Sequence, residues 1–594
     1  MNAKKKKLPR WAVCLLVLVA LGLIACVWEL ISSQNPYLLP VKRALKYEVL
    51  GMEPISQASR TAGLAEGYAV QYYGDGAAVD AFDGQTDRKT VYQDGTVTRL
   101  VNELDGYLLD FPAGTEFDFT LSPLFTRAQG EGFDATISRE TATYNGLGDV
   151  IRFELSTFLP FLFQDDSVRE HVEHYEYRFL LSQTWQENNR VSVERWTDES
   201  GVDFISAVIQ DPGDAVHDGY LYATVYTGSR EYLRVMCRYD SADAALRDRL
   251  CQGISQMWVF DPTGEGVYAT QYNLTLPENW TGETAQVFDD IVNGDGLRWG
   301  VFTQDIYETG IRETVPALEQ ALGYTFDVIL SYVPLNTDFP TEFMEENRQN
   351  GRIVELTFQV TDNNNEDMFA RSPLLDLYRG ELDEPIRSFA RQAADWGHPF
   401  LFRVNNEMNS DWTSYGGVVN LGDPQLFVSV WHRIYQIFQE EGVDNCIWIF
   451  NPNDRNAPPS KWNDSLAYCP GQEYFQMLGV TGYNNGTYYT QWNEQWREFD
   501  EIYDEIQEMY LPHFSQYPWI ITEFASSSIG GDKVAWINNM FDHMGDYPNI
   551  KIAVWFSYAD FDGDTPARPY WLDETEDTLE AFRQGLARTQ RGRS

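Results

Sequence analysis

Two glutamates are candidates for paired acid–base chemistry, because each is the first carboxylate after an apolar run. Glu407 follows the run 399–404, and Glu523 follows the run 519–522. Two carboxylates that flank one bond can hydrolyse a glycoside: one protonates the departing oxygen, and the other attacks the anomeric carbon or activates water. A single glutamate at a strand end is more often a solvated charge, so the hypothesis requires that both point into one cavity.

The elements that must position this pair are eight apolar runs that alternate with helical patterns over residues 297–590. We predict strands at 299–302, 326–330, 353–358, 399–404, 446–450, 477–480, 519–522 and 550–556. This alternation predicts an α/β fold, a (β/α)8 TIM barrel, in which strands four and seven face each other across the catalytic end. A doubly wound sheet would need a phosphate-binding glycine loop, and neither G-x-G-x-x-G nor G-K-[ST] occurs here.

The residues around both glutamates resemble the motifs of a known family. Arg403–Asn409 with Trp412, Gly479–Asn484 and Pro518–Phe524 occur in the order found in glycoside hydrolase family 26. That family includes β-mannanases and belongs to clan A, whose glutamates lie on strands four and seven. The runs 448–453 and 468–471 also fit, and the similarity covers about residues 297–588.

The resemblance implies roles for individual residues. Glu407 would be the acid/base and Glu523 the nucleophile of a retaining mechanism, with Tyr483 oriented on the nucleophile. Mannanases of the family usually carry His before the acid/base glutamate, where this chain has Asn406. An Asn there is common in the wider clan and usually contacts the sugar 2-hydroxyl, so the change puts mannan specificity in question.

Aromatic residues near the predicted mouth are candidates for sugar binding, because a sugar ring packs its C–H bonds on an aromatic face. We predict that Trp412, Tyr483 and Trp555 contact substrate together with Asn406. Trp555 closes the eighth strand and is the best platform candidate. The acidic run 560–564 lacks the closing glutamate of a calcium loop, and we interpret it as a polar substrate loop.

The composition excludes several classes of partner. The 594 residues hold 44 Lys and Arg against 89 Asp and Glu, a net charge of −45, which repels the phosphates of nucleic acids. Six cysteines without zinc-type spacing and seven histidines predict neither a metal site nor a cofactor. The expected ligand is therefore a polysaccharide.

The N-terminus predicts attachment to a membrane. A basic segment, residues 1–10, precedes an apolar segment, residues 11–31, which carries no charge from Trp11 to Trp28. Such a run is about as long as the shortest helix that crosses a bilayer. It is either a transmembrane signal-anchor or a lipoprotein signal, since Leu23–Cys26 resembles a lipobox with Cys26 as the lipidated residue. Either interpretation places the body outside the cell membrane.

The remaining segments complete the predicted organisation. Residues 32–66 are expected to form a tether, 67–262 a β-rich or α+β domain, and 263–296 a linker to the barrel. We find no catalytic constellation in 67–262, which could bind a glycan, peptidoglycan or another protein, or be a spacer. The function expected is a cell-surface, endo-β-mannanase-like hydrolase, with mixed-linkage β-glucan or xylan as alternative substrates. The competing hypothesis is a weak or inactive barrel that binds surface glycan or cell wall.

Overall fold

The computed structural model describes residues 68–142, 167–227, 231–294, 296–361, 369–492 and 494–591. The predicted basic segment, membrane segment and tether therefore lie outside the described residues. Within the described ranges, no helix is both long and apolar enough to cross a membrane.

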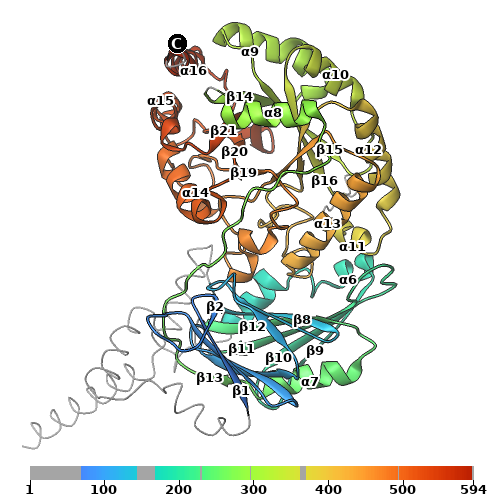
Figure 1. Cartoon of the computed structure of the whole chain (residues 1–594). Helices are drawn as coiled ribbons and strands as arrows, with labels where there is room; N and C mark the ends of the chain where they lie inside the picture. Colours follow the sequence, from blue (N-terminus) through green and yellow to red (C-terminus); the bar gives the residue numbers. More distant parts are fainter. Residues whose placement is uncertain are drawn as a thin grey trace, which may run out of the picture.

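A closed barrel of eight parallel strands forms the C-terminal half and confirms the predicted TIM barrel (Figure 1). Its last strand pairs in parallel with its first, which closes the ring. Both faces of these strands are buried, since side chains fill the interior and helices cover the outside. The strands, in order around the ring, are β14 (Arg298–Thr303), β15 (Val328–Pro334), β16 (Ile353–Gln359), β17 (Phe400–Val404), β18 (Cys446–Phe450), β19 (Met477–Thr481), β20 (Trp519–Phe524) and β21 (Ile550–Ser557).

Helices connect the strands and begin and end at recognisable signals. At the start of α13, the Asp423 side chain caps the helix by accepting from the Gln425 backbone N–H, and Pro424 takes the first helical position. At the end of α9, Gly323 adopts the left-handed conformation, which favours glycine because it has no Cβ. The helices of the barrel are α9 (Val315–Leu322), α10 (Thr341–Gln349), α11 (Pro373–Tyr378), α12 (Asp383–Trp396), α13 (Pro424–Glu440), α14 (Phe499–Phe514), α15 (Lys533–His543) and α16 (Glu576–Arg591).

The segment expected to be a linker carries a helix, α8 (Gly282–Asn293). Thr281 caps this helix, and Thr284 donates to the backbone carbonyl of Asp444, just before β18. Trp280 donates to the carbonyl of Cys446 at the start of the same strand. The helix therefore lies against the N-terminal end of the barrel, opposite the end where catalytic residues are expected.

The N-terminal region is a sandwich of two antiparallel sheets and confirms the predicted β-rich domain. One sheet has six strands, in the order β13 (Trp258–Val259), β5 (Tyr107–Pro112), β4 (Val97–Asn102), β3 (Arg88–Gln93), β1 (Ala69–Gly74) and β2 (Ala77–Val79). The other has seven, in the order β6 (Glu116–Asp118), β7 (Thr126–Gly130), β8 (Phe133–Thr141), β12 (Glu231–Tyr239), β11 (Gly219–Tyr226), β10 (Asp203–Ile209) and β9 (Val191–Thr197). An apolar core between them includes residues of α7 (Ala244–Ser255).

The central strands of the seven-stranded sheet are buried on both faces. On β11, Leu221 and Ala223 point into the sandwich core, while Tyr220 and Tyr222 point toward the barrel. The Tyr222 hydroxyl donates to the carbonyl of Leu421 at 2.6 Å, in the segment that joins β17 to α13. Figure 1 shows the sandwich below the barrel with α6 (Gln183–Asn189), α11 and α13 near their boundary.

The barrel segments that contact the sandwich follow the carboxyl ends of β16, β17 and β18. Besides 421–423, they include 370–381 and 460–462, where the side chains of Asn189 and Glu140 bind backbone groups. The sandwich therefore packs on the end of the barrel that carries both candidate glutamates.

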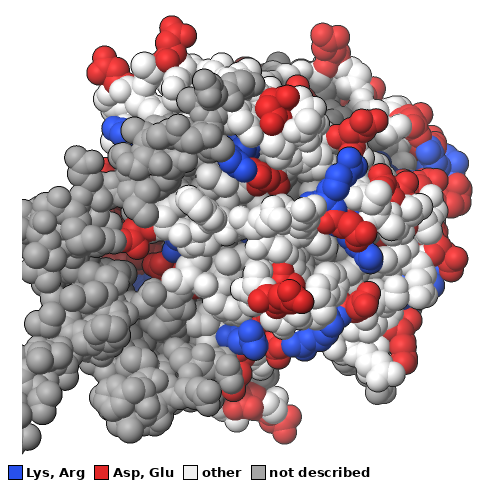
Figure 2. All heavy atoms as spheres, turned by 90° about the horizontal axis from the view of Figure 1, so that it is seen from below, with Lys and Arg blue, Asp and Glu red and all other residues white. Residues whose placement is uncertain are grey.

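Figure 2 views the surface of the protein from below. Charged side chains of both signs are interspersed on the part of this surface that the structure describes.

Candidate active site

Glu523, near the end of β20, is surrounded by hydrogen-bond donors. Nη1 of Arg403 lies 2.7 Å from its Oε1, and the Tyr483 hydroxyl donates to its Oε2 at 2.9 Å. Nδ2 of Asn406 donates to Oε1 at 3.4 Å. Only 6 % of Glu523 is exposed. An ionised carboxylate can accept all three bonds at once, so this environment suits a nucleophile.

Glu407 lies in a different environment from Glu523. It is 4 % exposed, and burial raises its pKa well above the ordinary value, with a further contribution from the negative charge of Glu523. This shift favours the protonated form of Glu407, the form that can give a proton to a leaving oxygen. The two carboxyl groups differ in the way that separates an acid from a nucleophile.

The backbone around Glu407 is strained. Asn405 and Glu407 both have positive φ values, which non-glycine residues seldom adopt. Two contacts hold this conformation: the Glu407 N–H donates to the carbonyl of Asn451, and the Val360 N–H donates to Oδ1 of Asn405. Strain of this kind persists where the surrounding structure fixes it and clusters at functional sites.

Asn406, between these two residues, has a fixed amide orientation. Its Oδ1 accepts bonds from Gln359 Nε2 at 3.1 Å and from the Tyr415 hydroxyl at 2.9 Å. Its NH2 group consequently points toward Glu523. The amide is therefore held with its donor group beside the Glu523 carboxylate, where it can also donate to a ligand oxygen.

Arg403 contacts a further buried glutamate, Glu355, besides Glu523. Sequence reasoning missed this residue. Arg403 Nε lies 3.1 Å from Oε1 of Glu355 on β16 and donates to Thr357 Oγ1 at 2.8 Å. Glu355 is fully buried, and burial raises its pKa to about 8. At neutral pH it is therefore protonated, which leaves the charge of Arg403 directed at Glu523. The available signal was a glutamate inside the apolar run 353–358.

The three predicted aromatic contacts lie in different surroundings. Trp412 is 46 % exposed, and Tyr483 borders the Glu523 carboxylate. Trp555 is fully buried, donates through Nε1 to the carbonyl of Tyr570, and packs against Trp536 and Phe582 of the outer helices. The prediction that Trp555 is a sugar platform is wrong, because its ring has no free face.

Phe556, the next residue along β21, lies beside Tyr483, where Trp555 was expected. Phe556 is partly exposed, and its ring lies 5.9 Å from that of Tyr483 in an edge-to-face arrangement. It also stacks on Phe302 of β14 at 4.7 Å. Successive residues of a strand point to opposite sides, so the aromatic wall beside Glu523 is offset by one residue from the prediction.

The acidic run after β21 forms a hairpin, β22 (Ala559–Asp562) and β23 (Thr565–Pro569). Arg568 Nη1 binds Asp560 Oδ2 at 2.7 Å, and the Tyr488 hydroxyl donates to Asp562. In the part of the chain that the structure describes, no cluster of three or more His, Cys, Asp or Glu could hold a metal ion.

Comparison with known proteins supports the resemblance seen in the sequence. Residues 374–512 match the family model described as Glycosyl hydrolase family 26. The matched range contains Glu407, Asn406 and Tyr483 and ends before Glu523. It lies entirely within the barrel half of the chain.

Among curated proteins, the chain is similar to Endoglucanase H of Acetivibrio thermocellus, with 25% identity over 279 residues. The alignment covers 46% of this chain and 29% of that protein, so the chain spans less than a third of its relative.

Solved structures with a similar fold include a Bacillus subtilis mannanase, at 15% identity, 50% of this chain and 95% of that one, with a TM-score of 0.35. A β-mannanase from Bacteroides ovatus is 15% identical over 51% of this chain and 93% of that one, with a TM-score of 0.39.

Proposed function

We propose that this protein is a retaining glycoside hydrolase that acts on β-linked polysaccharide. The observation that carries the proposal is the contrast between two carboxyl groups in one site. Glu523 accepts bonds from Arg403, Tyr483 and Asn406, whereas burial and the charge of Glu523 raise the pKa of Glu407 and favour its protonated form. The match of residues 374–512 to a glycosidase family model supports the same class of reaction.

The proposed reaction proceeds in two displacements. In the first, a Glu523 oxygen attacks the anomeric carbon while the glycosidic C–O bond breaks and Glu407 gives its proton to the leaving oxygen. This produces a covalent glycosyl-enzyme and an ionised Glu407. In the second, Glu407 takes a proton from water, the water oxygen bonds to the anomeric carbon, and Glu523 departs as a carboxylate.

The substrate that we propose first is β-mannan, acted on in an endo-β-mannanase-like manner. The resemblance to the mannanase family supports it, and Asn406 in place of the usual His keeps mixed-linkage β-glucan and xylan as alternatives. Endoglucanase H, by its name, acts on a glucan, and this keeps the glucan alternative in the test.

In the decisive experiment, the protein is incubated with mannan, mixed-linkage glucan and xylan, and the new reducing ends are measured. Proton NMR of the earliest product then reports its anomeric form, which must be β for a retaining enzyme on a β-linked substrate. Product of the α form would overturn the double displacement. Binding of a glycan with no reducing ends from any polymer would favour the alternative, a glycan-binding barrel without turnover.

We also propose that the N-terminal segment tethers the body to the outer side of the cell membrane. The basic residues before the uncharged run 11–28 support this orientation. In cells that make the full chain, the protein should stay with membranes after a carbonate wash, and external protease should degrade it. Cys26→Ser separates the two forms of tether: it releases a lipoprotein and leaves a signal-anchor in place.

A further inference from the structure

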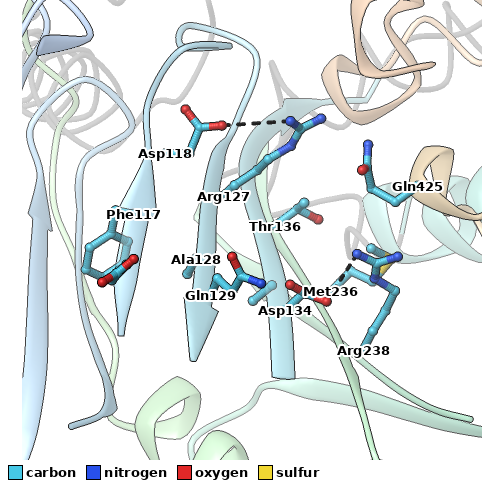
Figure 3. Close-up of a pocket in the computed structure, with 12 residues that line it drawn as sticks. Phe117, Asp118, Arg127, Ala128, Gln129, Asp134, Thr136, Met236, Arg238 and Gln425 are labelled. Carbon is cyan, nitrogen blue, oxygen red and sulfur yellow. Dashed lines mark hydrogen bonds and ion pairs between the residues drawn. The ribbon is translucent and has the colours of Figure 1, made fainter. Parts of the chain in front are cut away.

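A pocket of about 330 Å³ lies between the seven-stranded sheet and the barrel, away from the candidate catalytic residues. Neither Glu407 nor Glu523 lines it. Its volume is at the lower end of the range for small-molecule sites, about 300–1,000 Å³. The floor comes from β6, β7, β8 and β12, and Gln425 at the start of α13 closes it from the barrel side (Figure 3).

Side chains on the floor form two cross-strand rows on one face of the sheet. The strand register places Asp118 opposite Arg127, Arg127 opposite Thr136, Gln129 opposite Asp134, and Asp134 opposite Arg238. Residues two apart in a strand share a face, so all six point to the same side. Figure 3 shows these side chains on adjacent strands, each within reach of the pocket.

The charges in the pocket are arranged in pairs. Arg127 Nη1 lies 3.8 Å from Asp118, and Arg238 Nη2 lies 3.3 Å from Asp134. With Glu116 at the rim, three carboxylates face two guanidinium groups, a net charge of −1. An anion would meet excess negative charge. The described residues also contain no group that could hold a metal ion. The lining therefore disfavours an anion, and because four of its five charged groups are paired with each other, we take a ligand without net charge as the one to test.

Hydrogen-bonding capacity remains unused in this pocket. Nε of Arg127 is buried and has no hydrogen-bond partner among the described residues. A buried donor without a partner is costly, and a bound ligand can satisfy it. The pocket places guanidinium donors next to carboxylate and amide acceptors, an arrangement that matches hydroxyl groups, since each hydroxyl both donates and accepts.

One residue that lines the pocket, Phe117, is aromatic, but its ring does not face the floor. Phe117 stands opposite Ala128 and therefore points to the other face, where its ring packs against Phe111 at 5.5 Å in the sandwich core. Contact through hydroxyl groups, rather than stacking of a ring face, is the recognition that this surface offers.

We propose that this pocket binds one or two neutral sugar units, as a second saccharide site at the junction of sandwich and barrel. The chemical class follows from the paired charges, the unpartnered Arg127 donor and the volume. The choice of a saccharide among neutral hydroxylated ligands also rests on the proposed function, since a glycan is the molecule that the barrel is expected to meet.

The test counts binding sites by isothermal titration calorimetry on the full chain, solubilised in detergent, with Glu523→Ala to suppress the proposed turnover. The probes are manno-, cello- and xylotetraose. We expect two sites per chain for one of them. Arg127→Ala and, as a milder change, Thr136→Val should weaken only one site, by about tenfold or more. Arg247→Ala, which removes a charge from the distant helix α7, is the matched control and should change neither site.

Inorganic phosphate and glycine serve as probes for an anion and a zwitterion. Binding of either that depends on Arg127, without a second saccharide site, would overturn the proposed ligand class. A single saccharide site that Arg127→Ala leaves intact would overturn the site itself. Failure of the proposed function is distinguishable, because it would show as an inactive parent chain whose Arg127-dependent saccharide site persists.

Discussion

Two clusters of buried charge in this protein have the same composition and different surroundings. In the barrel, Arg403 lies between Glu355 and Glu523. At the junction with the sandwich, Arg234 lies 3.5 Å from Glu176, and Glu140 lies close by. Each cluster has one arginine, two glutamates and side chains exposed by 8 % or less.

The difference is in what satisfies each carboxylate. At the junction, Glu140 accepts from the backbone N–H groups of Lys461 and Trp462, and Ser460 donates to Glu176. These partners belong to the barrel segment after β18, so the cluster joins two parts of the chain. In the barrel, the Glu523 carboxylate meets side-chain donors, the Tyr483 hydroxyl and the Asn406 amide, beside a strained backbone. We infer that side-chain donors, which a substrate can replace as partners of a carboxylate, leave a buried charge available for chemistry. Backbone donors from another part of the chain instead use the charge to hold two parts of the protein together.

The largest effect is expected from removing the proposed nucleophile. Glu523→Ala should lower turnover by roughly 10⁴-fold or more on every glycan, since no other group forms the glycosyl-enzyme. Reducing-end assays on the substrate panel measure this loss. Glu473→Ala, an exposed carboxylate of the same barrel, is the control and should retain full activity. Substantial residual activity in Glu523→Ala would contradict its role.

Removing the acid should be less damaging and should depend on the leaving group. Glu407→Ala is expected to lower turnover of polymer by about 10²–10⁴-fold. Glycosylation should persist with an activated aryl glycoside, whose leaving group needs little protonation. The ratio of rates on aryl glycoside and polymer is the measurement. Equal losses on both substrates would show that Glu407 does not donate the proton.

The amide between the strained residues is the next test. Asn406→Ala should lower kcat by about 10- to 100-fold and change KM less, because contacts beside the anomeric carbon strengthen in the transition state. Asn350→Ala, on the surface, is the control. Asn406→His, which restores the mannanase residue, should shift preference toward mannan. Unchanged relative rates on mannan, glucan and xylan would remove Asn406 from substrate choice.

Glu355→Gln tests the barrel cluster through pH. The pKa of Glu355 is raised from 4.5 to about 8, so the folded state holds a proton that the unfolded state releases near the ordinary pKa. The unfolding free energy should therefore fall as pH rises between these two values, by up to about 5 kcal/mol, and then level off. The variant should lack this decline. Above the raised pKa it should also retain more of its activity than the parent, because Arg403 is no longer shared with a second carboxylate.

Denaturant titrations in acidic, neutral and alkaline buffer give the unfolding free energies, and kcat profiles on one glycan give the activity. Identical pH dependence in both proteins would show that Glu355 is not protonated at neutral pH.

The smallest effect on activity is expected at the junction. Glu140→Ala leaves the N–H groups of Lys461 and Trp462 without their acceptor and should cost about 2–3 kcal/mol of stability. Thermal denaturation measures this loss, with the exposed Glu131→Ala as control. We expect kcat to change by less than about threefold. A tenfold loss of kcat in the folded variant would show that the junction cluster also serves the reaction.

The sequence was sufficient to predict the barrel and to select Glu407 and Glu523 as candidates, because apolar runs followed by a first carboxylate are a local signal. The direction of Trp555 could not be predicted, since β21 is buried on both faces and shows no alternation of polar and apolar residues. Glu355 and Glu140 were missed for a related reason: whether a charged residue in a strand is buried depends on partners that are distant in sequence. Lys461 and Trp462, the partners of Glu140, belong to the other half of the chain.

The two-sided burial of the central strands of the seven-stranded sheet also has a consequence for biosynthesis. Tyr220 and its partner Asp423 are separated by 203 residues. At about 5–20 residues per second, the ribosome takes roughly 10–40 s to make that interval. During this time the strand that carries the tyrosines has been synthesised, and the barrel segment 421–423 that contacts them has not. A nascent chain of this protein thus exposes an apolar, aromatic surface for a time. The rate of translation sets how long that surface stays uncovered.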